Sequence, residues 1–343
     1  MVSGKVLSMK PRDIVHETLE FNSPNRVPRD LWLLPWANNN HPQKVKQIKE
    51  RFPSDFQGAP ARYAKPSRTT GDPHAIGTFT DEWGCTFENI QEGIIGEVRS
   101  PLLQTWGDLN KVVPPTEILT FDKEVVNAFC RDSDRFVFGG CCPRPFERLQ
   151  FLRGSQNLYM DLADPPGEFF ELLEVVHQFY LKELERWAST AVDGLNFMDD
   201  WGSQRNLLIS PKLWRKIFKP LYKEYIDLAH QAGKKIFMHS DGYIFDIVAD
   251  LIELGLDAIN SQLFVMDIEE IGRQFGGQIA FWGEIDRQHL LPFGTTEDIA
   301  SAVRRVKQAL YKDGGVIAQC EFGPGARPEN VEMVFQTWED VFV

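Results

Sequence analysis

An imidazole and a carboxylate stand two residues apart at the end of one apolar run in this sequence. The run Ile236-Phe237-Met238 stops at His239, and Asp241 follows after a single serine. Side chains two apart on an extended segment point to the same side, so both could reach one ligand. Imidazole nitrogen and carboxylate oxygen are ordinary ligands of zinc and other divalent metals. The spacing indicates a candidate metal site, although a histidine at a strand end is often only hydrogen-bonded to a neighbour.

Five further apolar segments end in residues that can bind a metal or a polar substrate. The carboxyl ends of the strands in a parallel barrel share one face, and ligands bind there. Aspartate and asparagine at such ends also cap the next helix, so each end alone has an ordinary explanation. Six ends that meet on one face favour a functional pocket. The further ends are Cys141 with Cys142, Asp199 with Asp200, Asn260 with Gln262, Glu284 with Asp286, and Cys320 with Glu321.

Cys320 is the second candidate metal ligand, because thiolate and imidazole are both good ligands for zinc. A free cysteine is also a common small core residue, so Cys320 could simply be buried. A catalytic zinc site has three protein ligands and an open position. Asp241, Asn260 or Glu284 could supply the third ligand.

The pair Asp199-Asp200 is a candidate for proton transfer, and Glu284 is another. Side chains alternate along a strand, so one aspartate of the pair faces the barrel interior and the other faces the helix layer. We expect the outward aspartate to cap a helix or loop. The inward one could move protons or orient His239.

Polar and aromatic residues in the loops after the strands are candidates for substrate contacts. An arginine there could bind a carboxylate of the substrate, although a solvated surface arginine is the usual case. The candidates are Trp36, Arg144, Gln204, Arg205, Asn260 and Gln262.

These residues need a scaffold that brings strand ends together, and the second half of the chain predicts one. From residue 135 onward apolar strands alternate with amphipathic helices, which implies right-handed βαβ units and a parallel sheet. The strand interiors are continuously apolar, as in a sheet covered on both faces. We therefore predict an α/β fold, a single TIM-type (β/α)8 barrel over residues 1–343. The predicted strands are 26–35, 135–142, 194–200, 234–241, 257–262, 279–286 and 315–321.

The helices that separate these strands are marked by caps and by apolar positions at helical spacing. An amphipathic helix also opens the chain before residue 22. Residues 38–125 are rich in proline, glycine and asparagine, and we predict an irregular excursion that folds over the pocket, with a hairpin in 80–101. The later predicted helices are 164–189, 210–233, 243–255 and 267–277, followed by helices that begin near 295 and 328.

Composition restricts the class of protein. The chain has 343 residues, 43% of them hydrophobic, and a formal net charge of −12. A strongly acidic chain disfavours non-specific binding to nucleic acid or to an anionic membrane surface. No apolar run approaches the roughly 20 residues that span a bilayer, and no signal peptide is visible. The five cysteines are irregularly spaced, so we expect no disulfide framework and a cytoplasmic location. The sequence does not indicate an oligomeric state.

Several segments together resemble the uroporphyrinogen decarboxylase superfamily in order and spacing. The resemblance covers nearly the whole chain and implies a TIM-type barrel. The segments that carry it are "RDIVHETLEFNSPNRVP", "DEWGCTFEN", "FMDDWGSQ", "PLYKEYIDLAHQAGKKIFMHSDG", "FWGEIDRQHLLPFGTTEDI" and "ARPENVEMV".

Two branches of this superfamily are distinguished by their motifs. True uroporphyrinogen decarboxylases carry arginines after the first strand that bind the acidic tetrapyrrole, whereas this chain reads "LLPWANNNHPQKV" there. Corrinoid-linked methyltransferases hold zinc with His-x-Cys and a later cysteine ahead of a Pro-Glu-Asn helix start. His239 and Cys320 resemble the outer two ligands, and Asp241 stands in place of the middle cysteine. The implied metal ligands are therefore His239, Asp241 and Cys320, around zinc or another divalent metal.

The resemblance favours metal-dependent methyl transfer in one-carbon metabolism, with a corrinoid (cobalamin) that is either free or carried by a partner corrinoid protein. The methyl group would move to or from an oxygen or nitrogen compound of small size. Two alternatives stay open. One is a metal-free decarboxylase, a carboxy-lyase acting on a tetrapyrrole or another carboxylated small molecule. The other is a non-catalytic barrel that binds a small molecule or a corrinoid.

Overall fold

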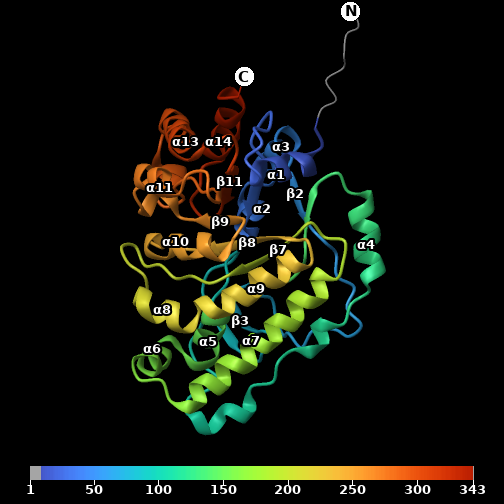
Figure 1. Ribbon diagram of the computed structural model, residues 1–343, viewed down its shortest axis with the longest axis vertical. Coiled ribbons are helices and arrows are strands. Elements are labelled where there is room, and N and C mark those ends of the chain that lie inside the picture. The colour runs from blue at the N-terminus through green and yellow to red at the C-terminus, as the bar shows by residue number, and fades with distance from the viewer. Residues whose placement is uncertain (1–8, 343) are drawn as a thin grey trace, which may run out of the picture.

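Eight parallel strands form a nearly closed barrel with helices around it, so the chain is a single TIM-type (β/α)8 barrel (Figure 1). The structure is a computed structural model that describes residues 9–342. Neighbouring strands follow the order β1-β11-β10-β9-β8-β7-β6-β2. The strands are β1 (Arg29–Leu33), β2 (Phe56–Gly58), β6 (Phe136–Phe138), β7 (Gly194–Met198), β8 (Lys235–Ser240), β9 (Ala258–Ser261), β10 (Ala280–Trp282) and β11 (Val316–Phe322).

Strands β1 and β2, at the two ends of this order, are joined mainly by a buried carboxylate and not by a full set of backbone hydrogen bonds. One backbone hydrogen bond joins the amide of Asp55 to the carbonyl of Arg29, at 2.9 Å. The Asp55 carboxylate accepts from the Arg29 amide at 2.7 Å and pairs with the Arg26 guanidinium at 2.6 Å. Asp55 is almost fully buried, so this charge-assisted pairing holds β1 beside β2.

Helices cover the outside of the barrel, and short helices fill the loops (Figure 1). Those of the first half are α1 (Pro11–Leu19), α2 (Pro35–Asn40), α3 (Pro42–Arg51), α4 (Lys123–Asp132), α5 (Pro145–Arg153), α6 (Ser155–Ala163) and α7 (Gly167–Ala188). Those of the second half are α8 (Pro211–Ile217), α9 (Lys219–Gln231), α10 (Phe245–Leu254), α11 (Ile268–Phe275), α12 (Leu290–Phe293), α13 (Thr296–Leu310) and α14 (Pro328–Asp340). Three 3-10 helices are η1 (Trp106–Lys111), η2 (Thr116–Leu119) and η3 (Leu263–Val265).

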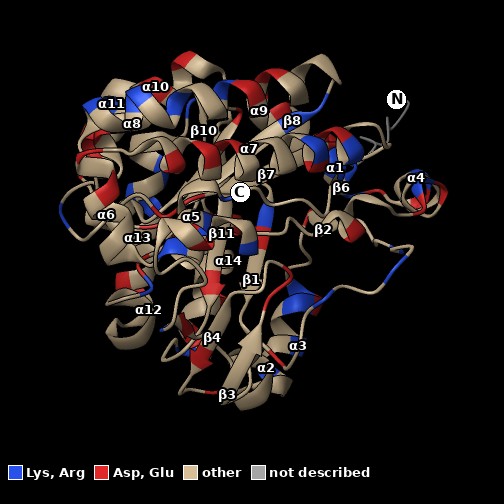
Figure 2. Ribbon diagram, turned by 90° about the horizontal axis from the view of Figure 1, so that it is seen from below, with Lys and Arg blue, Asp and Glu red and all other residues tan. Residues whose placement is uncertain are grey.

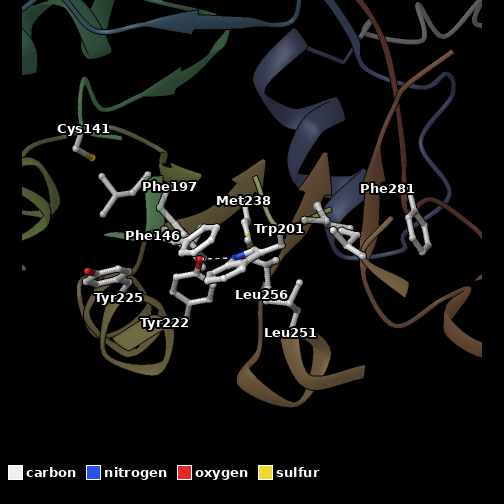
Figure 3. Packing of buried hydrophobic residues seen from close by; sticks show 14 of the residues in the cluster. Cys141, Phe146, Phe197, Trp201, Tyr222, Tyr225, Met238, Leu251, Leu256 and Phe281 are labelled. Atoms are coloured by element: carbon white, nitrogen blue, oxygen red, sulfur yellow. Dashed lines mark hydrogen bonds between the residues drawn. The ribbon is translucent and has the colours of Figure 1, made fainter. Parts of the chain in front are cut away.

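The core has two layers, one inside the barrel and one between the barrel and the helices. Aromatic rings fill the barrel: Phe138 lies 4.8 Å from Phe237 and 5.7 Å from Trp282 between ring centroids. In the outer layer Trp201 stacks on Phe146 at 4.1 Å, and its indole N–H donates to the Tyr222 hydroxyl at 2.7 Å (Figure 3). Each large apolar side chain buried in this way contributes roughly 1.5–3 kcal/mol. The rigid barrel that results fixes the strand ends.

The structure adds one strand to the seven predicted and divides one predicted helix. Strand β2 has three residues and lies inside 38–125, too short to show a strand pattern. The segment 210–233 forms two helices, α8 and α9, that meet at Phe218. Pro220 lies at the start of α9, where its missing N–H removes no helical hydrogen bond, and the same residue would interrupt a continuous helix.

The region 38–125 contains both barrel elements and a true excursion. Helix α3 and strand β2 belong to the barrel wall, and the excursion begins after Gly58. It includes an antiparallel sheet of β3 (Gly77–Thr80), β4 (Thr86–Asn89) and β5 (Glu97–Val98), which contains the hairpin predicted for 80–101. The buried guanidinium of Arg148 on α5 pairs with Asp81 beside this sheet. A buried ion pair therefore connects the excursion to the helix layer.

Acidic and basic residues are interspersed over most of the helices, with no large region of a single sign (Figure 2). No helix among residues 9–342 combines the length and apolar character needed to cross a bilayer.

The Arg148–Asp81 pair gives a stability prediction. Replacing Arg148→Met leaves the carboxylate of Asp81 buried without its cation, and breaking a buried pair in this way costs about 3 kcal/mol. Urea denaturation should show this loss. The matched control Arg304→Met removes an exposed pair with Glu297 and should change stability by less than about 1 kcal/mol. Equal effects of the two substitutions would contradict the structural role of Arg148.

Candidate active site

His239 lies at the end of β8 and is oriented by a neighbouring amide. Its Nδ1 is 2.5 Å from Oδ1 of Asn260 on β9, and the Asn260 amide nitrogen donates to the carbonyl of Trp282. Because that donation directs the amide oxygen toward the imidazole, Nδ1 of His239 carries the proton and donates it. The other nitrogen, Nε2, is left free to accept a proton or bind a metal. A partner that fixes the tautomer in this way is typical of metal-ligating histidines.

Two carboxylates face the free nitrogen of His239. Nε2 lies 3.6 Å from Oδ1 of Asp200 and 3.6 Å from Oδ1 of Asp241. One ligand atom from each of the three residues lies within 4.8 Å of the others. Oδ1 of Asp241 is buried and has no hydrogen-bond partner among the described residues. An orphaned carboxylate oxygen beside an unprotonated imidazole nitrogen fits a divalent cation.

A single arginine holds the remaining carboxylates of the site. The guanidinium of Arg287 donates to Oδ2 of Asp241 and, at 3.0 Å, to Oε2 of Glu321. Its Nε lies 3.5 Å from Oε1 of Glu284. One cation thus serves three acidic groups, and Asp200 adds a fourth. This excess of carboxylates favours an additional positive charge at the site.

Burial raises the pKa of two of these carboxyls. It raises the pKa of Glu284 well above its ordinary value, although Arg287 opposes the shift. Burial also raises the pKa of Asp200, and the neighbouring imidazole of His239 opposes that shift. Because a metal binds the ionised carboxylate, loading a metal here would release protons.

Asp199 and Asp200 have different roles, as strand alternation predicts. Both carboxylate oxygens of Asp199 cap helix α5, accepting from the amides of Phe146 at 3.1 Å and Glu147 at 2.8 Å. The Tyr222 hydroxyl also donates to Asp199, at 2.6 Å. Burial raises the pKa of Asp199 well above its ordinary value. Asp199 is thus bound within the helix layer, and Asp200 is the member that faces His239.

The structure does not bring Cys320 to the candidate metal ligands. On β11, Cys320 alternates with Gln319 and Glu321, and it pairs in register with Leu31 in the outer core layer. Its thiol is fully buried there, and burial raises the pKa of Cys320 well above its ordinary value. The sequence predicts Cys320 as a metal ligand. In the structure its side chain points to the face of the sheet that is opposite to the barrel interior. Glu321 faces the barrel interior instead.

The other predicted contact residues are spread over the mouth of the barrel. Gln262 is buried and accepts from the Gly242 amide at 3.2 Å, beside Glu284 and Arg287. Gln204 and Arg205 are exposed in the loop after β7. Trp36 lies on α2, edge-on to His41. Arg144 lines a separate cavity beneath the excursion.

Sequence reasoning missed a pair of residues beneath His239. The Trp32 ring lies 5.4 Å from the His239 ring between centroids. The buried carboxylate of Asp30 accepts from the indole N–H of Trp32 at 2.8 Å and of Trp282 at 3.0 Å. These side chains border a cavity of about 240 Å³ that Phe138 and Asn196 also line. Their alternation along "RDLWL" is the signal that places them on the inner face.

Comparisons with known proteins agree with this architecture. The model of the family described as uroporphyrinogen decarboxylase (URO-D) matches residues 73–341. No curated protein matches the sequence. A methyltransferase from Methanosarcina mazei has a similar structure, with a TM-score of 0.71, 12% identity, and coverage of 98% of this chain and 100% of that chain. A D-psicose 3-epimerase, at 11% identity over 69% of this chain and 84% of that chain, has a TM-score of 0.35, too low to support an inference.

Asp30 gives a prediction on the pH dependence of stability. Burial raises the pKa of Asp30 from 3.8 to about 6, against the indole hydrogen bonds that lower it. The folded state therefore binds this proton more tightly than the unfolded chain does. The contribution of Asp30 to stability is largest below pH 3.8 and is lost as the pH rises through about 6.

The variant Asp30→Asn removes this titration. Between pH 4 and pH 8 its stability relative to the wild type should improve by about 2 kcal/mol, most of the full effect of the pKa shift. Chemical denaturation of both proteins at several pH values measures the difference. A stability difference that stays constant over this range would show that Asp30 titrates normally.

Proposed function

The chain belongs to the uroporphyrinogen decarboxylase family, and on that premise we propose that it is a metal-dependent methyltransferase that works with a corrinoid. The observation that carries the proposal is the free Nε2 of His239 between the carboxylates of Asp200 and Asp241. The similar fold of a methyltransferase supports it. The proposed metal ligands are His239, Asp200 and Asp241, and Cys320 is not among them.

The chemistry of these donors favours zinc or another divalent metal that accepts nitrogen and oxygen ligands. When bound, such a metal would supply a Lewis acid that polarises the atom giving or receiving the methyl group. With no thiolate among the three donors, the ligand set is harder than the His-x-Cys type. This supports oxygen or nitrogen compounds as methyl donors or acceptors.

Residues around the three ligands would position them and handle protons. Asn260 fixes the tautomer of His239, and Arg287 holds one oxygen of Asp241 so that the other remains free. Burial, with the charge of Asp200 adding to it, raises the pKa of Glu147 to about 7. One oxygen of Glu147 is buried and has no hydrogen-bond partner within residues 9–342. Glu147 is therefore suited to exchange a proton with a leaving or attacking group at neutral pH.

The size of the cavities fits a small substrate and an external corrinoid. The cavity beside Trp32 is about 240 Å³ and that beneath the excursion about 330 Å³, at or below the usual lower range for small-ligand pockets. Neither encloses a corrinoid macrocycle. We propose that a corrinoid, free or on a partner protein, approaches the barrel mouth from solvent.

Decarboxylation of a tetrapyrrole is less well supported by the site. The segment after β1 forms helix α2 with the sequence PWANNN, which carries no cation. The guanidinium of Arg287 is already bound by carboxylates of the chain. A multiply charged acid would therefore enter a site whose arginine is occupied, at a cost in desolvation. A binding barrel without catalysis would leave the raised pKa of Glu147 without a role.

The proposed ligand set predicts which substitutions weaken zinc binding. Asp241→Asn and His239→Ala should each reduce zinc affinity at least tenfold in a calorimetric titration, because each removes one of three ligands. Cys320→Ala should bind zinc as the wild type does and should instead lose stability, because it leaves a small cavity in the core. Loss of zinc binding in Cys320→Ala, with full binding in Asp241→Asn, would contradict the assignment.

A paired assay separates methyl transfer from decarboxylation. Zinc-loaded protein with methylcobalamin and a panel of phenol, amine and thiol acceptors should convert methylcob(III)alamin to cob(I)alamin and yield a methylated acceptor. The same protein with uroporphyrinogen III under anaerobic conditions should yield no decarboxylated product. Decarboxylation at an ordinary enzymatic rate, or demethylation that is unchanged in His239→Ala, would overturn the proposal.

A further inference from the structure

A second cavity lies beneath the excursion. It is separate from the cluster of His239, Asp200 and Asp241, which we call the His239 group. Its volume is about 330 Å³, which falls in the range of pockets that hold small organic ligands. One wall is the antiparallel sheet β3–β4, and the opposite wall is formed by helices α5 and α7 and the segment after β6. The cavity is therefore covered on one side by a sheet that the barrel fold itself does not require.

Aromatic rings form the apolar part of the walls of this cavity. Phe79 and Phe87 contribute from the sheet, Phe151 from α5 and Phe179 from α7. Trp83 lies edge-on to Phe179 at 5.0 Å between ring centroids. Rings in such positions pack edge-on or offset against another flat ring. The shape and chemistry of the walls favour a planar, apolar ligand body.

Two arginines line the cavity, and only one of them is used by the chain itself. Arg148 pairs with Asp81 and lies 3.6 Å from Glu82, and its Nε is 3.4 Å from the Tyr180 hydroxyl. Arg144 lines the same cavity and forms no direct ion pair among residues 9–342, although Glu147 acts on it electrostatically. A partly buried guanidinium without an anion is a ready partner for a ligand carboxylate, which it can bind through two parallel hydrogen bonds.

The remaining polar groups limit the charge of the ligand. Burial, assisted by the charge of Glu82, raises the pKa of Glu183 to about 8, so this cavity-lining carboxyl is mainly protonated at neutral pH. It can donate a hydrogen bond to an anion. Asp81 and Glu82 remain as negative charges beside Arg148. Arg144 is therefore the guanidinium that a ligand can reach, and it matches one carboxylate and not two.

We propose that the cavity beneath the excursion binds an aromatic monocarboxylate, with the carboxylate on Arg144 and the ring between the aromatic walls. Arg144 directly precedes helix α5, and Glu147 lies in the first turn of that helix. Arg144, Asp200 and His239 all act electrostatically on Glu147, so a ligand on Arg144 lies near the His239 group. That this ligand is the compound that donates or accepts the methyl group rests on the proposed function; the binding itself does not.

Calorimetric titration of the full chain with benzoate tests the proposal. The protein is first treated with a chelator, so the result does not depend on metal or on methyl transfer. Wild type should bind one benzoate per chain with a Kd at or below about 1 mM. Benzamide, which keeps the ring but lacks the charge, should bind at least tenfold more weakly. Phthalate, with a second carboxylate, should also bind more weakly because of Asp81 and Glu82.

Substitutions of Arg144 test whether benzoate binds at its guanidinium. Arg144→Gln should weaken benzoate binding at least tenfold, and Arg144→Lys should weaken it less, because lysine keeps the charge but not the planar fork. Arg131→Gln, on the exposed face of α4, is the matched control and should bind as the wild type does. Thermal melting checks that all variants are folded.

Three results would overturn the proposal: no saturable benzoate binding by wild type, equal binding of benzamide, or unchanged binding in folded Arg144→Gln. If benzoate binds as expected while metal-dependent methyl transfer fails, the proposed function is wrong and the cavity stands. If methyl transfer succeeds while benzoate does not bind, the proposed metal site stands and the proposed binding of an aromatic acid is wrong.

Discussion

The alternation of side chains along the barrel strands is the constraint on which the site depends. Each strand sends one residue inward and the next into the helix layer. At the end of β7 this separates Asp200, which faces His239, from Asp199, which caps α5. At the end of β11 it separates Glu321, which binds Arg287, from Cys320, which packs in the core. A shift of either strand by one residue would exchange these roles and dismantle both the site and the helix layer.

The same rule decides how much could be predicted from sequence. The barrel, the polar strand ends and the two roles of the aspartate pair follow from periodicity. The thiol chemistry of Cys320 favours it as a ligand, but the run "VIAQCEF" places polar Gln319 and Glu321 on the other face and so identifies the inward positions. Strand β2 has three residues, too few for a period to be recognised. Arg287 lies beyond a strand end in an irregular segment, where no pattern predicts direction. The aromatic cavity combines segments far apart in sequence and could not be predicted at all.

Electrostatics gives the site its character. Several carboxyls meet in a place where burial penalises charge, and a single guanidinium compensates only part of them. Burial raises the pKa of two of them, Glu284 and Asp200, above the ordinary carboxyl value. Either a divalent cation or protons kept on the carboxyls can compensate the remaining negative charge. The site can therefore couple cation binding to proton release, which is a property of the whole group rather than of one residue.

The pairing of β1 with β11 has a consequence for how the protein folds. In this pairing Trp32 stands in register with Glu321, so residues from the two ends of the chain meet beside the same pocket. Contacts of such long sequence separation form late, because the entropy of closing the loop must be overcome first. We expect the helix layer and the central strands to collapse before this junction forms. The pocket would then be the last part of the molecule to be assembled. A chain still emerging from the ribosome would have the ligands of β8 in place before the pairing of β1 with β11 completes the pocket around them.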